Sequence, residues 1–214
     1  MQLGIFAKTF RRPSLALTLD AVRDYGLNVI QFNLESAGID SMPSEIPDGL
    51  PALIRSETRA RAIEIAALSG TFNMIHPDSA VVAQGLASLE LLASAAGLMG
   101  ARLVTLCTGT RDSGNMWRRH PENDSSAAWQ SLLSTMEQAL VFAERHRVAL
   151  GIEPEPGNVI NSARKCRRLL DEFSSPWLKV IFDPANIIST DMTRDPSTLI
   201  DEALVARMAP SGSR

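Results

Sequence analysis

The chain has 214 residues, of which 45% are hydrophobic and 21% are charged, and its formal net charge is −3. This composition is typical of a globular protein with one hydrophobic core, and it excludes an intrinsically disordered chain. The slight excess of acidic residues argues against a general nucleic-acid-binding protein. We therefore expect a single domain over residues 1–206, followed by a disordered tail at residues 207–214.

The chain ends and the cysteines indicate a compartment. The N-terminus enters a strand-like run at once, without the basic and apolar regions of a signal peptide. We expect no membrane-spanning segment, because Ser, Glu and Gly interrupt even the apolar region 86–99. Two cysteines, Cys107 and Cys166, are too few for a disulfide framework or a zinc cluster. These features predict a cytoplasmic protein with no membrane partner.

Short apolar strands alternate with amphipathic helices in the first half of the chain. The expected strands cover residues 3–7, 28–33 and 70–75, and the expected helices cover residues 14–25, 56–68 and 78–99. Ser14 is a typical N-cap residue, whereas Gly26 and Gly100 are typical of the position that follows a helix. The Pro- and Gly-rich stretch 36–51 is expected to form a loop.

The alternation continues in the second half. Strands are expected at residues 102–107, 148–152 and 178–182, and helices at residues 126–146, 162–173 and 196–206. A long polar loop, 108–125, follows the fourth strand. Six consecutive strand–helix units with short links predict parallel strands joined by right-handed crossovers. This leaves a doubly wound open sheet or a (β/α)8 barrel.

The strand ends favour the barrel. A doubly wound nucleotide-binding sheet usually has a Gly-rich turn after an early strand, and none is found here. Polar or ionisable residues instead follow one strand after another, namely Lys8, Glu35, His76, Thr108, Glu153 and Asp183. Functional residues at many strand ends are typical of a barrel. We therefore predict a (β/α)8 TIM-barrel type fold with about six β/α units present.

Two acidic motifs carry the functional prediction. Residues 153–156 read Glu-Pro-Glu-Pro and residues 183–186 read Asp-Pro-Ala-Asn, each directly after an apolar run. Carboxylates at the ends of successive parallel strands could converge on one divalent cation. The alternative is that Glu153 and Asp183 only cap the helices that follow, where acids are favourable in any protein.

These motifs resemble the Glu-Pro-Lys-Pro strand end and the acid-x-x-His turn of the sugar isomerase/epimerase superfamily with the xylose-isomerase-like barrel. The resemblance covers nearly the whole chain in element order and is sharpest between residues 107 and 188. It implies that Glu153 and Asp183 bind a metal, either Mg²⁺ or Mn²⁺, with Co²⁺ or Zn²⁺ also used in the superfamily. The cation would polarise a ketose or aldose carbonyl, while Glu153 and Glu155 move a proton between adjacent carbons.

Two departures from the family pattern narrow the expected reaction. Glu155 stands where xylose isomerases have a lysine, and Asn186 stands where the family often has a histidine. The resemblance therefore implies an epimerase or a general isomerase rather than a hydride-shifting xylose isomerase. Glu155 is equally well interpreted as a base, as a partner of a metal ligand or as a solvated loop acid.

Further residues are expected to contact a sugar. The candidates are His76, Trp117, Asn158 and Asn186. Trp117 would offer an apolar plate for a sugar ring, and the neighbouring arginines of the 108–125 loop would clamp a phosphate or carboxylate. For His76, capping of a helix or packing beside Pro77 is an equally good interpretation.

A complete barrel of this family has eight strands, and its last two supply a further histidine and glutamate. No histidine follows His146 here, and residues 207–214 look like a tail. We therefore expect a C-terminally truncated barrel that binds metal weakly, with open sheet edges through which two copies would pair. The expected function is a sugar or sugar-phosphate isomerase/epimerase. A truncated, inactive barrel and a dehydratase of the inositol-catabolism type are alternatives, and an apurinic-site endonuclease is disfavoured by the acidic charge.

Overall fold

The computed structural model describes residues 2–188 and 195–208. Within them, six parallel strands form one sheet in sequence order, with β1 and β6 at its edges. The strands are β1 Ile5–Phe6, β2 Val29–Phe32, β3 Glu64–Ser69, β4 Leu103–Leu106, β5 Ala149–Ile152 and β6 Leu178–Val180. Parallel strands in sequence order, alternating with helices, confirm the predicted barrel-type architecture.

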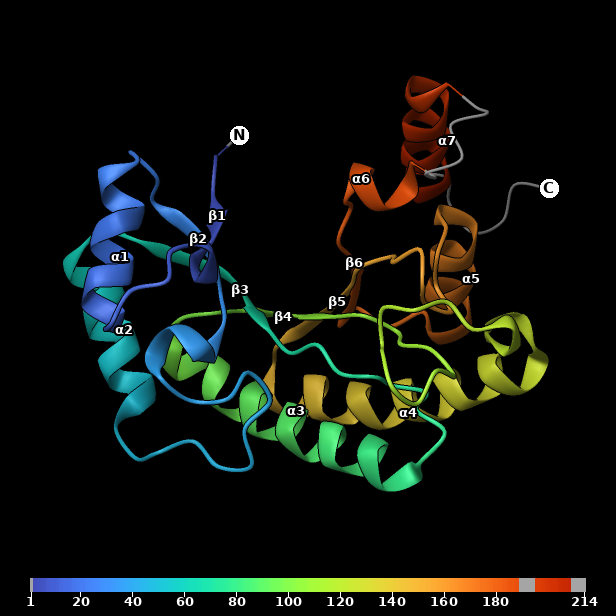
Figure 1. Ribbon diagram of the computed structural model, residues 1–214, viewed down its shortest axis with the longest axis horizontal. Helices are drawn as coiled ribbons and strands as arrows, with labels where there is room; N and C mark the ends of the chain where they lie inside the picture. Colours follow the sequence, from blue (N-terminus) through green and yellow to red (C-terminus); the bar gives the residue numbers. More distant parts are fainter. Residues whose placement is uncertain (1, 189–194, 209–214) are drawn as a thin grey trace.

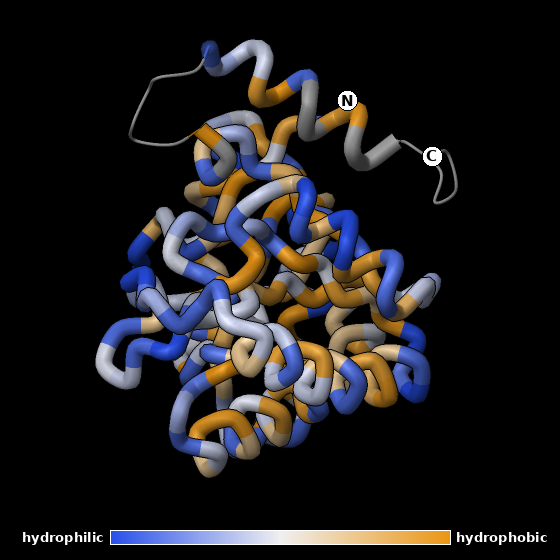
Figure 2. Tube along the Cα trace, turned by 90° about the vertical axis from the view of Figure 1, so that its right-hand side faces the viewer, coloured by the Kyte–Doolittle hydropathy of each residue, from blue (hydrophilic) through white to orange (hydrophobic). Residues whose placement is uncertain are grey.

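The helices that link the strands lie on the outer side of the curved sheet. They are α1 Leu15–Asp24, α2 Leu50–Ala60, α3 Ser79–Met99, α4 Ser126–His146, α5 Ala163–Phe173, α6 Pro184–Ile187 and α7 Pro196–Met208. Figure 1 shows α1 to α5 running around the arc of strands, with α6 and α7 beyond β6. In Figure 2, α7 lies at one end of the molecule, and hydrophobic segments lie in the interior of the rest of the protein. Of the predicted tail at 207–214, the residues from 209 onward lie outside the described residues.

Several helix boundaries follow the sequence signals. The Ser14 hydroxyl accepts a hydrogen bond from the Leu17 N–H (3.3 Å) at the start of α1. Gly100 adopts a left-handed conformation (φ 92°) at the end of α3, which only glycine adopts without strain. The predicted bounds of α4 are also confirmed.

The predicted third strand, 70–75, and the helix before it, 56–68, are misplaced. The helix is α2, which ends at Ala60, and the strand is β3 at Glu64–Ser69. The alanine-rich run 62–69 has a high helix propensity, but it pairs in parallel with β2 and β4. Tertiary pairing therefore overrides local propensity here. A second difference is that β6 ends at Val180, and the short helix α6 follows it.

The expectation about membrane-spanning segments also needs correction. By length and composition alone, α3 is long and apolar enough to cross a membrane. In the structure its buried side chains belong to the hydrophobic core, and the helix packs against α2 and α4. The core helix of a globular protein meets the same criterion, so this feature carries little weight.

The register of the strands decides which side chains face the inside of the arc. Gln31 on β2 donates from Nε2 to Thr105 Oγ1 on β4 (3.3 Å), across the intervening strand. Thr105 pairs in register with Gly151, whereas the neighbouring residue Leu150 is fully buried on the helical side. Because side chains alternate along a strand, Glu153 continues the inner row after Gly151. The inner row therefore ends in a carboxylate.

Two glycines of α3 allow a matched test of core packing. A Cβ at Gly85 would lie 2.1 Å from Cδ2 of Phe72, whereas a Cβ at Gly97 would meet nothing within 4 Å. We expect Gly85→Ala to lower the free energy of unfolding by about 1–3 kcal/mol through overpacking. We expect Gly97→Ala to raise it by about 0.5 kcal/mol, because alanine favours the helix. Urea denaturation followed by circular dichroism measures both, and equal effects would contradict the packing of Phe72 on α3.

Candidate functional site

Three carboxylates follow the last two strands and form what we call the acidic cluster: Glu153, Glu155 and Asp183. Glu153 continues the sheet, since its N–H donates to the carbonyl of Leu106 (2.9 Å) at the end of β4. Asp183 precedes α6, and its Oδ1 accepts from the Ala185 N–H (2.8 Å). The capping interpretation is therefore confirmed for one oxygen of Asp183. No hydrogen bond within the described part of the chain makes Glu153 a helix cap.

The acids of the cluster interact with one another. Burial raises the pKa of Glu153 to about 7, and the charges of Glu155 and Asp183 add to that rise. Burial also raises the pKa of Glu155, with a contribution from Asp183, while the Asn186 amide opposes the rise. Asn186 Nδ2 lies 3.3 Å from Glu153 Oε1 and donates to it. The structure thus brings together four of the predicted site residues: Glu153, Glu155, Asp183 and Asn186.

The acidic cluster has the kind of ligand that a divalent cation prefers, but its three carboxylates are not placed to share one ion. Carboxylate oxygens are the ligands that Mg²⁺ and Mn²⁺ prefer. Across residues 2–188 and 195–208, however, no group of three or more His, Cys, Asp or Glu side chains is placed to hold an ion. Glu153 and Asp183 therefore provide at most an incomplete metal site within the described residues.

Cys107 lies beside the acidic cluster, which sequence reasoning did not foresee. It follows β4 on the inner row, two residues after Thr105, and its thiol donates to the Phe72 carbonyl (Sγ–O 3.6 Å). Burial raises the pKa of Cys107 to about 12, and the charges of Glu155 and Glu153 act in the same direction. The thiol is therefore protonated at neutral pH and is no nucleophile. Its position at a strand end was the only available signal.

The predicted sugar-binding residue Asn158 is fully buried. Its Oδ1 accepts from the Gly109 N–H (2.8 Å), and its Nδ2 donates to the Met116 carbonyl (3.0 Å). In this conformation the amide ties the loop after β5 to the loop after β4. Asn158 thus positions these loops, and direct contact with a substrate would require it to release main-chain partners.

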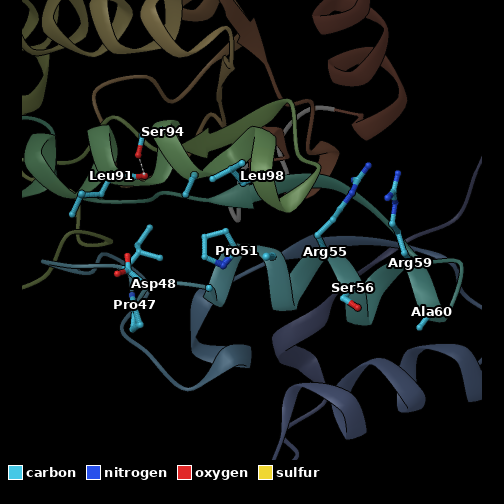
Figure 3. Close-up of a pocket in the computed structure, with 14 residues that line it drawn as sticks. Pro47, Asp48, Pro51, Arg55, Ser56, Arg59, Ala60, Leu91, Ser94 and Leu98 are labelled. Carbon is cyan, nitrogen blue, oxygen red and sulfur yellow. Dashed lines mark hydrogen bonds between the residues drawn. The ribbon is translucent and has the colours of Figure 1, made fainter.

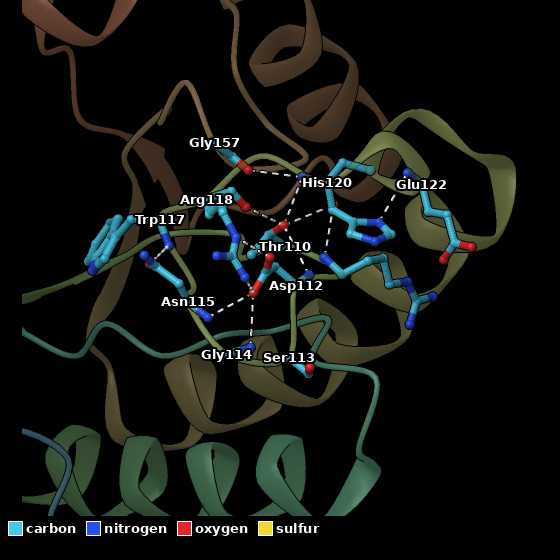
Figure 4. Close-up of polar contacts among 12 residues, drawn as sticks. Thr110, Asp112, Ser113, Gly114, Asn115, Trp117, Arg118, His120, Glu122 and Gly157 are labelled. Atoms are coloured by element: carbon cyan, nitrogen blue, oxygen red, sulfur yellow. Dashed lines mark hydrogen bonds and ion pairs between the residues drawn. The ribbon is translucent and has the colours of Figure 1, made fainter.

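A second buried asparagine, Asn123, organises the 108–125 loop and was missed from the sequence. Its Oδ1 accepts from the Arg111 N–H (2.8 Å), and its Nδ2 donates to the Gly157 carbonyl (2.9 Å). The Thr110 hydroxyl also accepts a hydrogen bond from Asn123 Nδ2 (3.0 Å). Figure 4 shows Thr110 and Gly157 among the polar contacts at the centre of this region. The loop after β4 is therefore fixed to the loop that carries Glu155.

Trp117 is 53% exposed, so it is not part of the core between helices and sheet. Its ring points away from the hydrogen-bonded centre of the loop in Figure 4. Its main chain packs closely on Gly157, where a Cβ would lie 2.1 Å from the Trp117 carbonyl oxygen. An exposed indole on a fixed loop is what a sugar plate requires.

The arginines beside Trp117 already have carboxylate partners. Arg118 Nη2 donates to Asp112 Oδ1 (2.9 Å), and this contact holds the pKa of Asp112 well below its usual range. Arg119 forms an ion pair with Asp124. The predicted phosphate clamp is therefore engaged within the loop itself.

His76 lies several residues beyond the end of β3, because that strand ends at Ser69. Its Nδ1 accepts from the Asp78 N–H (3.0 Å), and its Nε2 lies 3.2 Å from the Ser113 carbonyl. It lines a groove with residues of α3 and α4, and no described contact joins it to the acidic cluster. The capping interpretation of His76 fits this placement.

We expect Asn123→Ala to lower the free energy of unfolding by about 2–4 kcal/mol, because the buried Gly157 carbonyl and the partly buried Arg111 N–H lose their partner. Asn115→Ala is the matched control, since the side chain of exposed Asn115 has one hydrogen bond within the described residues, accepted from the Trp117 N–H (2.9 Å). It should change stability by less than about 1 kcal/mol. Urea denaturation measures both variants. Equal losses would show that Asn123 does not hold the two loops together.

Comparisons with known proteins place this geometry in a family. The family model of the xylose isomerase-like TIM barrel matches residues 19–209. No curated protein sequence matches the chain significantly.

Solved structures share the fold at low sequence identity. A 3-keto-D-glucoside 4-epimerase, YcjR, from E. coli has a TM-score of 0.68 and 13% identity, covering 95% of this chain and 75% of its own. A xylose isomerase-like TIM barrel protein from Mycobacterium smegmatis, in complex with magnesium, has a TM-score of 0.69 and 14% identity, covering 95% and 71%. The IOLI protein with a binding zinc atom has a TM-score of 0.67 and 14% identity, covering 91% and 66%. With the family model spanning most of its length, the chain belongs to the xylose isomerase-like TIM barrel family.

Proposed function

We propose that this protein is a sugar or sugar-phosphate isomerase/epimerase-type barrel whose acidic cluster transfers a proton next to a ketose or aldose carbonyl. The observation that carries the proposal is the convergence of Glu153, Glu155 and Asp183 after β5 and β6. Carboxyl ends of barrel strands are where this fold places its chemistry. The structural relatives named above include an epimerase of a keto sugar derivative, which is consistent with this chemistry.

Isomerisation and epimerisation both need a group that removes a proton from carbon and a group that returns one. Glu153 suits either role, because a pKa of about 7 keeps both of its protonation states populated near neutral pH. Glu155 is the second proton-transfer group, since it is half-buried beside Glu153. Asn186 orients Glu153 through its amide N–H and presents a carbonyl oxygen for a sugar hydroxyl.

The proposed cofactor is a divalent cation, Mg²⁺ or Mn²⁺, bound by Glu153 and Asp183, with Co²⁺ or Zn²⁺ as alternatives. When bound, it would polarise the substrate carbonyl. The repulsion among the three carboxylates, which contributes to the raised pKa of Glu153, favours an added positive charge at this position.

The proposed partners follow from the same surface. The substrate is a small polyol, with or without a phosphate, that would stack on Trp117, and neither nucleic acid nor membrane is proposed as a partner. Two buried free cysteines, Cys107 and Cys166, suit the cytoplasm as the proposed location. The edges of the described sheet, β1 and β6, are where a second copy would pair.

One observation favours a second candidate, a sugar-binding barrel without turnover. The described residues hold no complete ligand set for a metal ion. Proton transfer next to a carbonyl is slow without an electrophile to stabilise the developing oxyanion. The two experiments that follow test metal binding and turnover separately.

We expect the chain to bind Mn²⁺ weakly and Glu153→Gln to weaken that binding at least about fivefold, because a charged ligand is lost. Glu35→Gln is the control: Glu35 follows β2, is exposed and pairs only with Lys8 (3.8 Å) among the contacts described. The affinity of the Glu35→Gln variant for Mn²⁺ should equal that of the wild type. Isothermal titration calorimetry measures all three proteins, and equal affinities would remove Glu153 from the metal site.

We expect little or no isomerase or epimerase turnover from the 214-residue chain, because catalytic metal sites usually have three or more protein ligands. The assay incubates the protein with Mn²⁺ and a panel of ketoses and ketose phosphates in D₂O. Nuclear magnetic resonance then detects both product and solvent deuterium at the carbon beside the carbonyl. Slow deuterium incorporation that Glu153→Gln abolishes would support proton transfer by the acidic cluster, and no incorporation would favour the sugar-binding barrel. Rapid turnover would contradict the incomplete ligand set.

A further inference from the structure

A large groove lies between α2 and α3, on the helical side of the sheet (Figure 3). Its volume is about 930 Å³, which is within the range of small-molecule sites. It shares no residue with the acidic cluster. Its lining comes from the loop before α2, from one face of α2 and from the second half of α3.

One part of the groove is apolar. Pro47, Pro51 and Ala52 line it on one side, and Leu91 and Leu98 line it on the other. Leu98 is 66% exposed although it belongs to a helix whose opposite face lies in the core. Covering this surface would remove apolar area from water.

The other part of the groove is cationic. Arg55 and Arg59 lie one turn apart on α2, and Figure 3 shows both side chains extending in the same direction. Neither guanidinium group has a hydrogen bond or an ion pair within the described residues. By contrast Arg61 on the same segment pairs with both Asp20 and Glu57, each at 2.6 Å. Like charges one helical turn apart repel each other, so an anion between them would be stabilising.

The position of Arg55 depends on a glycine. A Cβ at Gly100 would lie 1.4 Å from Arg55 Nη1, so the guanidinium occupies the space that a side chain would fill. Gly100 ends α3, where the last carbonyls favour a positive charge. Asp48, the one acid that lines the groove, lies at the Pro47 end in Figure 3, away from the two arginines.

We propose that this groove binds a small amphipathic anion. Its phosphate or carboxylate head would lie between Arg55 and Arg59, and its apolar body would cover Leu91 and Leu98. Charge complementarity selects the head group, because guanidinium groups bind both anions through paired N–H donors. The volume of the groove and its leucine wall select a compact apolar body. This site is independent of the reaction proposed for the acidic cluster.

The test uses hexyl phosphate and hexanoate as probes, with inorganic phosphate and 1-hexanol as half-probes, in calorimetric titrations of the full chain. We expect a hexyl anion to bind at least about tenfold more tightly than either half-probe, because head and body contribute together. The double variant Arg55→Gln/Arg59→Gln should lose at least about tenfold in affinity. The matched control is Arg102→Gln, because Arg102 is exposed and lies outside the groove.

The outcomes separate the two head groups and the rival occupants. Tighter binding of hexyl phosphate identifies a phosphate head, and tighter binding of hexanoate identifies a carboxylate. Equal losses in the double variant and in Arg102→Gln would overturn the site, as would inorganic phosphate binding as tightly as hexyl phosphate.

Sedimentation equilibrium adds a further check. A dimer of the wild type that the double variant dissociates would make the groove an interface between copies and overturn the proposal. Circular dichroism confirms that the variants fold.

Discussion

The parallel pairing of β5 with β6 is the constraint on which the acidic cluster depends. Leu150 pairs with Leu178 and Ile152 with Val180, so both strands reach the same edge of the sheet. The carboxyl ends of parallel strands meet at one edge, and the polar residues that follow them are therefore crowded. Glu153 and Asp183 interact because of this pairing and not because they are close in sequence. A change in the register of β6 would separate them.

Loop packing adds a second level of order. The main chain at Trp117 lies so close to the main chain at Gly157 that only glycine fits at position 157. Asn123 and Asn158 hold the same two loops through buried amide groups. Buried amides with all partners satisfied make a loop rigid, because releasing any one partner leaves a polar group without a hydrogen bond. Trp117 and Glu155 are thus parts of one fixed surface at the end of β4 and β5.

The sequence predicts the order of elements well because that order rests on local signals. Caps such as Ser14 and Gly100 act on their own helix, and an apolar run that ends in an acid identifies the end of β5. The predicted position of the third strand was wrong because the alanines of β3 favour a helix locally. Pairing with β2 and β4 instead makes this run a strand. The burial of Asn158 could not be predicted either. It depends on contacts with Gly109 and Met116, far away in sequence, and an amide in a motif looks the same whether it is open or engaged.

Asp112 and Glu153 contribute to the pH dependence of folding stability in opposite directions. The pKa of Asp112 lies below its usual range, so its ion pair with Arg118 stabilises the fold at neutral pH and is lost in acid. Burial and the neighbouring charges of Glu155 and Asp183 raise the pKa of Glu153 from 4.5 to about 7. Its contribution to folding stability therefore falls as pH rises through that interval. The ionised Glu153 carboxylate therefore lowers the stability of the fold, whereas the ionised Asp112 carboxylate raises it. The crowding of Glu153, Glu155 and Asp183 is a strain on stability that an added cation or a shared proton would relieve, and active sites are where such strain is tolerated.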